Sequence, residues 1–197
     1  ATDMAMALYS GTCGSLTQVA CSDPNTMDLC GLNPGQTYYL RVWTFTATLG
    51  LGANFNVCVG TTGAAPANDD PCNALTVPYS YSCNYQTFSN LGACASSGVP
   101  APGCANYQGG DVWFKTTVPC EGKLIFDTRT GTITDGGMAI YRGTCSGLTL
   151  IECDDDDSQN GAMPRIQRND LVPGETIWVR MWEYGNDNNG TFGLCIS

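Results

Sequence analysis

The sequence has no histidine and few basic residues, with eight Lys and Arg against eighteen Asp and Glu in 197 residues and a formal net charge of -10. Without imidazole, no Ser–His or Cys–His catalytic pair can form, and the usual nitrogen ligands of zinc and haem are absent. The acidic balance would repel nucleic-acid phosphates. These absences predict a protein that is not an enzyme and does not bind nucleic acid.

Long apolar runs and helical patterns are also lacking. No run approaches the ~20 apolar residues that a membrane-spanning helix needs, so we expect no transmembrane segment. The 24 Gly and 10 Pro separate short stretches in which apolar residues alternate with polar ones, which is typical of strands. We therefore predict an all-β fold, a two-sheet jelly-roll-like sandwich. The expected strands are 6–9, 37–45, 54–59, 112–118, 123–128, 138–141, 148–152, 176–184 and 191–196.

What is abundant is cysteine. Twelve cysteines, an even number, indicate disulfides and an oxidising location, extracellular or at the cell surface. We expect three local bridges, namely Cys13–Cys21, Cys145–Cys153 and Cys94–Cys104. A bridge from Cys72 to Cys195 would join the start of a domain to its end, but Cys83 and Cys120 compete for it. Cys58 pairs either with Cys30 or with a cysteine in a segment absent from this sequence.

The sequence repeats itself about 132 residues apart. Ten of nineteen positions are identical between DMAMALYSGTCGSLTQVAC, which starts at Asp3, and DGGMAIYRGTCSGLTLIEC, which starts at Asp135. The match resumes at Leu32 and Leu171 and again at Phe55 and Phe192. We interpret residues 1–60 as the C-terminal half of a β-sandwich repeat, 61–67 as a linker and 68–197 as a complete repeat.

Half of such a repeat buries too little apolar surface to be stable alone. We therefore expect another segment to cover residues 1–60. That segment is either the first half of the same domain or part of a neighbouring molecule.

A run of acidic residues follows one of the expected strands. Four adjacent carboxylates repel one another unless they are solvated or neutralised, and hard oxygen ligands in a loop suit Ca²⁺. Asp135 begins the strand expected to pair with this one. The predicted calcium ligands are Asp135, Asp154, Asp155, Asp156 and Asp157. The alternative is a solvated loop that keeps the protein soluble, and the first copy has a single carboxylate at this place.

The expected strand at 176–184 alternates sharply between two faces. One face carries an arginine between aromatic residues, which is the arrangement of a cation–π ladder. The residues are Trp178, Arg180, Trp182 and Tyr184, with Tyr39, Arg41 and Trp43 at the same places in the first copy. Flat aromatic faces stack on sugar rings, so this face is a candidate platform for surface glycans. The alternative is that the ladder stiffens the sheet or packs under a loop.

Several of these motifs together resemble a known family. GGDVWFKTTVP, TDGGMAIYRGTC, LTLIECDDDD, LVPGETIWVRMW and GTFGLC resemble the repeated β-sandwich domains of large secreted and surface proteins of Bacteroidota. Those domains are distantly similar to the pre-peptidase C-terminal domains of secreted proteases. The resemblance implies an exported all-β module that serves in adhesion, structure or substrate binding and has no shared catalytic motif.

Two functions follow from these observations. The first is an extracellular structural or adhesive protein of tandem, disulfide-stapled β-sandwich repeats, whose partners are neighbouring repeats or copies of itself, joined into a surface fibre by completion of the half-domain. The second is a non-catalytic carbohydrate- or substrate-binding module of a secreted hydrolase.

Overall fold

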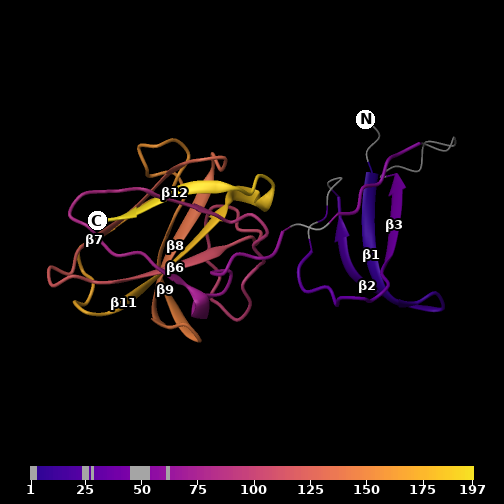
Figure 1. Ribbon diagram of the computed structural model, residues 1–197, viewed down its shortest axis with the longest axis horizontal. Helices are drawn as coiled ribbons and strands as arrows, with labels where there is room; N and C mark the ends of the chain where they lie inside the picture. Colours follow the sequence, from indigo (N-terminus) through magenta and orange to yellow (C-terminus); the bar gives the residue numbers. More distant parts are fainter. Residues whose placement is uncertain (1–3, 24–26, 28, 45–53, 61–62) are drawn as a thin grey trace. The chain divides into compact units, whose positions relative to one another are not determined.

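The computed structural model describes residues 4–23, 27, 29–44, 54–60 and 63–197, and every structural statement below concerns these residues. Four positions used in the sequence predictions lie outside the described residues. They are Asp3, residue 45 at the end of one expected strand, and the linker residues Thr61 and Thr62. The chain divides into two compact units, unit 1 at Ala1–Thr61 and unit 2 at Thr62–Ser197 (Figure 1). Both are built from strands, so the all-β prediction is confirmed.

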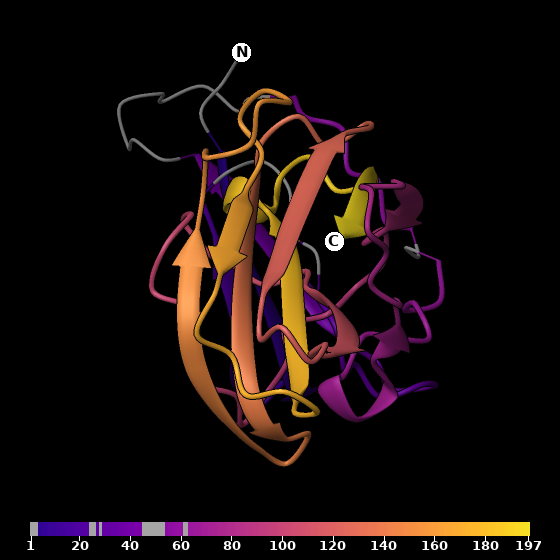
Figure 2. The same ribbon diagram turned by 90° about the vertical axis from the view of Figure 1, so that its left-hand side faces the viewer.

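Two sheets form unit 2. The five-stranded sheet has the order β4-β6-β11-β8-β9, and the four-stranded sheet has the order β10-β7-β12-β5. Figure 2 shows the long orange strands β8 and β9 side by side in the first of these. The strands of unit 2 are β4 (Leu75–Thr76), β5 (Gln86–Ser89), β6 (Val112–Thr117), β7 (Leu124–Thr130), β8 (Gly136–Thr144), β9 (Gly147–Asp154), β10 (Arg165–Arg168), β11 (Thr176–Glu183) and β12 (Thr191–Ile196). Two short 3₁₀ helices, η1 (Pro71–Asn73) and η2 (Tyr184–Asn186), complete it.

The main apolar core lies between these two sheets. Alternation along β11 places Ile177, Val179 and Met181 in it, each fully buried, and Phe114 of β6 and Phe192 of β12 meet there edge to face. The four-stranded sheet covers only this face of the larger sheet.

A second cluster covers the other face of the five-stranded sheet. Trp113, Tyr141 and Trp182 are fully buried there beneath residues 94–110. The Trp182 indole nitrogen donates to the carbonyl of Ala105 at 3.0 Å, so the covering loop is hydrogen-bonded to the rings beneath it. Both faces of this sheet are therefore buried, which explains why its strands are apolar on both sides.

Unit 1 is one antiparallel sheet of order β2-β1-β3, made of β1 (Met4–Thr12), β2 (Ser15–Ser22) and β3 (Tyr39–Thr44). Its register is that of β9-β8-β11 in unit 2. Ala7 pairs with Cys21 and Arg41, and Ala139 pairs with Cys153 and Arg180.

The two sheets also share an irregularity. The register shifts between Leu8 and Tyr9 in unit 1 and between Ile140 and Tyr141 in unit 2. Gly11 and Gly143 precede the following turns with φ of 109° and 115°, and a Cβ at either place would lie 2.3 or 2.2 Å from a backbone oxygen. Only glycine fits there, which is why both copies carry glycine as the first residue of the sequence Gly-Thr-Cys.

One expected strand does not form. Residues 54–60 are exposed and belong to no strand, whereas the matching stretch of unit 2 is β12. β12 lies between β7 and β5, and both of these come from the first half of its domain. A strand needs a neighbour for its backbone hydrogen bonds, so the sequence pattern alone is not sufficient at residues 54–60.

Candidate functional site

Three carboxylates meet at one end of the five-stranded sheet. Asp135 immediately precedes β8, and Asp155 and Asp156 immediately follow β9. Because Met138 pairs with Asp154, the start of one strand lies beside the end of the other. One carboxylate oxygen from each of the three lies within 4.8 Å of the others.

This cluster is short of positive charge. Burial raises the pKa of Asp135, as do the charges of Asp156 and Asp187. Burial also raises the pKa of Asp155, with further contributions from Asp156 and Asp135. The Oδ1 atom of Asp155 is buried without a hydrogen-bond partner, so its negative charge is uncompensated within the described chain.

The other two predicted ligands point elsewhere. Oδ2 of Asp154 accepts hydrogen bonds from the backbone N–H of Arg165 at 2.7 Å and of Asp157 at 3.3 Å. Asp154 thus holds the loop in shape, and Asp157 lines a separate pocket. The cluster of close oxygens therefore comprises Asp135, Asp155 and Asp156, and the assignment of Asp154 and Asp157 as further ligands stays a prediction.

Replacing Asp155 by asparagine should stabilise the metal-free protein. A raised pKa means that the folded state binds protons more tightly than the unfolded state does. The charged carboxyl therefore reduces stability at pH values above its raised pKa. This loss of stability disappears as the pH falls toward 3.8, the ordinary pKa of aspartate. Asp155→Asn should raise the melting temperature by ~2–4 °C at neutral pH and by less near pH ~5, measured by thermal unfolding in a chelator.

The matched control is Asp170→Asn. Hydrogen bonding to Arg168 lowers the pKa of Asp170, so this substitution should leave unchanged or reduce the melting temperature at neutral pH. An equal shift in both variants would contradict the electrostatic explanation.

A polar pocket of about 410 Å³ adjoins the same loop. Its lining residues are Tyr85, Asp127, Asp157, Gln159, Asn160 and Arg165. The Tyr85 hydroxyl donates to Asp127 at 2.9 Å, and the Asn160 amide donates to the Tyr85 oxygen at 2.9 Å. Arg129 lies over the Tyr85 ring at 4.8 Å from its centroid, so this side chain is held at its hydroxyl and over its ring. No sequence motif marks these residues, which come from four separate segments.

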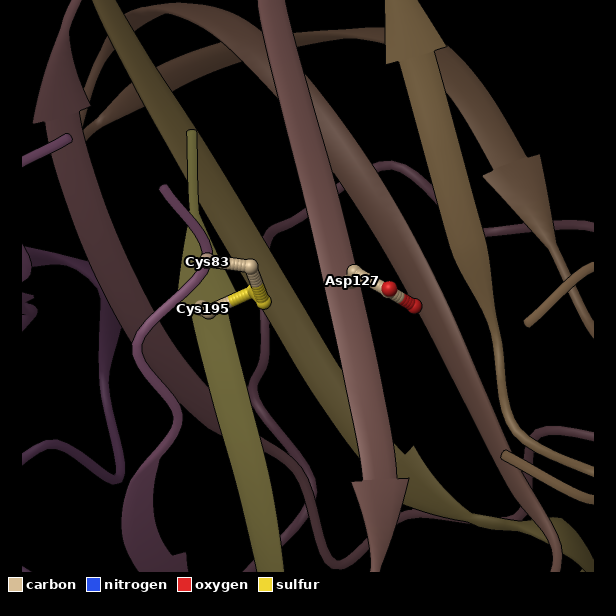
Figure 3. A group of neighbouring side chains, drawn as sticks. All are labelled: Cys83, Asp127 and Cys195. Atoms are coloured by element: carbon tan, nitrogen blue, oxygen red, sulfur yellow. A yellow bond between two sulfur atoms is a disulfide. The ribbon is translucent and has the colours of Figure 1, made fainter. Parts of the chain in front are cut away.

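Asp127 also lies beside Cys83 and Cys195 (Figure 3). The two sulfurs form a disulfide, so they cannot act as thiolate ligands, and this trio is not a metal site. Asp127 instead accepts hydrogen bonds from Tyr85 and from Ser158 at 2.8 Å.

The aromatic ladder on β11 is buried, not exposed. Trp178, Arg180 and Trp182 are 7%, 1% and 0% exposed, and only Tyr184, in η2, is open to solvent. The prediction of a sugar-binding platform on this strand is therefore wrong. Residues 94–110 occupy the place where a sugar would have stacked.

Arg180 forms an ion pair with Asp111, which is also fully buried. The Arg180 Nε donates to Asp111 at 3.0 Å, and its guanidinium lies 4.1 Å from the Tyr107 ring centroid. Burial lowers the pKa of Arg180, but the Asp111 carboxylate more than offsets this, and the net shift is upward. Asp111 also accepts from Ser96 at 2.7 Å, Tyr107 at 2.6 Å and Trp113 at 2.9 Å. This carboxylate, which precedes β6, holds the covering loop onto the sheet.

The first-copy ladder differs. Arg41 is exposed and Tyr39 and Trp43 are half-buried, with the Arg41 guanidinium 5.4 Å from the Trp43 ring centroid. Its role in glycan binding stays a prediction.

All three expected local disulfides differ from the structure. Cys104 bonds to Cys153, Cys72 to Cys145 and Cys83 to Cys195. Cys94 is disulfide-bonded, although not to Cys104. Cys13, Cys21, Cys58 and Cys120 are exposed thiols, which also overturns the Cys30–Cys58 alternative.

The reason is strand geometry. Cys145 lies in the turn before β9 and Cys153 near the end of β9. At ~3.3 Å per residue they are ~20–25 Å apart, whereas a disulfide requires Cα atoms within ~7 Å. The same holds for Cys13, in the turn before β2, and Cys21, near the end of β2.

Residues 67–189 match the family model described as "Galactose binding domain-like", of the T9SS-associated kind. This match spans more than half of the chain. The chain belongs to this family. Such galactose-binding-like domains are typically non-catalytic modules, and the family together with the disulfides points to a secreted or cell-surface protein.

Among solved structures, a 1.0 Å crystal structure of the pre-peptidase C-terminal domain of collagenase from Bacillus anthracis is similar at 10% identity and a TM-score of 0.41, covering 63% of this chain and 94% of that chain. No curated protein matches the sequence. The described residues contain no helix long and apolar enough to cross a membrane. The T9SS-associated family agrees with the resemblance to secreted modules of Bacteroidota.

Proposed function

We propose that this T9SS-associated module is a structural or adhesive part of an extracellular array of β-sandwich repeats, assembled into a surface fibre. The observation that carries the proposal is the shared register of β2-β1-β3 and β9-β8-β11, including the bulge at Tyr9 and Tyr141. Two copies of the same three-stranded arrangement in one chain are what a tandem array requires.

The Cys83–Cys195 disulfide supports a structural role. It joins residues 112 positions apart, near the two ends of unit 2. Tension that enters before Cys83 and leaves after Cys195 passes through the disulfide and bypasses nearly all of the sandwich. A module so connected carries load while the residues between Cys83 and Cys195 stay folded.

Self-adhesion is the direct test of the adhesive function. Beads that carry the folded chain should cluster with one another, and beads that carry reduced, alkylated chain should not. Absence of clustering at physiological ionic strength would contradict adhesion between copies. It would not affect the load-bearing role, which is tested separately by force spectroscopy.

Calcium binding at Asp135, Asp155 and Asp156 is part of the proposal. Oxygens that share one ion at ~2.4 Å, the Ca²⁺–oxygen distance in proteins, lie no more than ~4.8 Å apart, and these three meet that limit. The bound cation would then neutralise the charge of Asp155, whose Oδ1 atom has no hydrogen-bond partner. Ca²⁺ at ~10 mM should raise the melting temperature by ~3–10 °C if the site has the ~10⁻⁴–10⁻³ M affinity of extracellular modules. Mg²⁺ at the same concentration should have little effect, and Asp156→Asn should abolish the Ca²⁺ effect.

A second candidate function, carbohydrate binding, is favoured by the pocket around Tyr85. An aromatic ring held by Arg129, with carboxylate, amide and guanidinium groups around it, can bond the hydroxyls of a sugar. Galactose is the probe suggested by the family description. Gln159→Ala and Arg165→Ala should each weaken galactose binding ~10-fold in calorimetric titration, with Gln108→Ala as a control outside the pocket. Unchanged affinity in both variants would exclude the pocket.

A further inference from the structure

Three exposed thiols of unit 1 occupy places where unit 2 has disulfides. Cys13, Cys21 and Cys58 correspond to Cys145, Cys153 and Cys195 by register and by sequence match. The partners of the latter are Cys72, Cys104 and Cys83. All three partners come from the leading half of the repeat, residues 66–134. Unit 1 therefore presents the complete set of thiols that bond to a leading half in unit 2.

Apolar side chains of unit 1 are exposed at places that are buried in unit 2. Leu40 is 39% exposed and its counterpart Val179 is 0% exposed. The remaining pairs, with their exposed fractions, are Phe55 (52%) and Phe192 (0%), Val57 (53%) and Leu194 (0%), and Val59 (84%) and Ile196 (2%). The counterparts are buried by β5, β6 and β7, which all belong to the leading half.

Charge gives a third, independent correspondence. Arg41 is exposed, whereas its counterpart Arg180 is 1% exposed and paired with Asp111, again from the leading half. A segment that supplies a carboxylate at the place of Asp111 would complement Arg41.

We infer that unit 1 binds a polypeptide of leading-half type and is joined to it by three disulfides. This segment carries three cysteines at the places of Cys72, Cys83 and Cys104, strands equivalent to β5, β6 and β7, and a carboxylate for Arg41. Residues 54–60 become a strand between two of the supplied strands. The inference rests on the repeat relationship in the proposed function and adds the identity and chemistry of the partner.

Each bond forms by thiol–disulfide exchange with a small-molecule disulfide such as oxidised glutathione. One thiol of unit 1 and one of the partner lose two electrons and two protons together, and the oxidant is reduced to two thiols. The three bonds consume three molecules of oxidant.

The test uses the full folded chain with its exposed Cys120 replaced by serine. The partner is ¹⁵N-labelled residues 66–134 of the same sequence with Cys94 and Cys120 replaced by serine, and the two are co-oxidised in a glutathione buffer. Non-reducing proteolysis and mass spectrometry identify the cross-links. Six cysteines allow about 15 connectivities, and we expect one to dominate at least ~10-fold, namely Cys13–Cys72, Cys21–Cys104 and Cys58–Cys83. The same three cross-links can also form between two copies of the unlabelled full chain, and these would support the same pairing.

Two controls keep the result decisive. Cys72→Ser in the partner should remove the Cys13 cross-link and leave the other two, and a partner of scrambled sequence with the same cysteine spacing should give no dominant pattern. Should the labelled segment fail to stay in solution, secretion of both chains together into an oxidising compartment gives the same map. Cys13–Cys21 bonding, unreacted thiols or mixed pairings would overturn the inference. The bead-clustering experiment contains no added partner segment, so it tests the adhesive function independently of this inference.

Discussion

Reduction should lengthen unit 2 by about 370–400 Å when the protein is pulled between residues 66 and 197 in a force spectrometer. With the disulfides intact, the shortest covalent path through unit 2 runs along the backbone from Cys72 to Cys83 and then across to Cys195. Reduction returns the 112 residues between Cys83 and Cys195 to that path, at ~3.3–3.6 Å each. Unit 1 lies outside the stretched segment, so it does not affect the measured length.

A variant without the Cys83–Cys195 bridge separates the contributions. In Cys83→Ala/Cys195→Ala, the shortest path crosses from Cys72 to Cys145 and then follows the backbone, which adds about 130–140 Å relative to the intact protein. Cys120→Ala, which removes an exposed thiol, should change nothing. Equal extension before and after reduction would show that the disulfide does not carry load, and the structural function would fail.

Replacing Arg180 by methionine should cost ~3–5 kcal/mol in the free energy of unfolding of unit 2. Arg180 and Asp111 are 1% and 0% exposed, so the substitution leaves a carboxylate buried without its cation. Tyr107 also loses the guanidinium that lies over its ring. Denaturant unfolding followed by tryptophan fluorescence measures this, because Trp113, Trp178 and Trp182 lie in the same cluster.

Arg142→Met is the matched control. Arg142 is 43% exposed and 3.7 Å from Glu175, and an exposed pair of this kind contributes at most ~1 kcal/mol. Adding Asp111→Asn to Arg180→Met should recover part of the loss, since a neutral amide needs no buried cation. If Arg180→Met alone costs under ~1 kcal/mol, the buried pair does not anchor the covering loop.

Disulfide pairing shows where reasoning from the sequence fails. Cys145 and Cys153 are eight residues apart and suggest a local bridge, but an extended strand keeps them far apart. Each bonds instead to a cysteine in a distant segment, 73 and 49 residues away. Pairing depends on which loops cross the sheet, and one sequence contains no signal for that.

The strand and ladder predictions fail for a related reason. The alternation along β11 is correctly predicted, but alternation does not reveal which face is covered. Likewise, residues 54–60 have the pattern of β12 and yet form no strand, because hydrogen-bonding neighbours are a tertiary property. The acidic loop was recognised by charge, whereas the orientation of Asp154 away from Asp155 depends on the backbone N–H of Arg165.

The all-β class, the repeated Gly-Thr-Cys segments and the alternation along the strands can be predicted from residue order, because they depend on neighbours along the chain. Which faces are covered, how the cysteines pair and which carboxylates meet become known only from the folded arrangement. Those properties depend on contacts between residues far apart in the chain, such as Cys83 with Cys195 at 112 positions and Asp111 with Arg180 at 69 positions. Local pattern contains no information about such contacts.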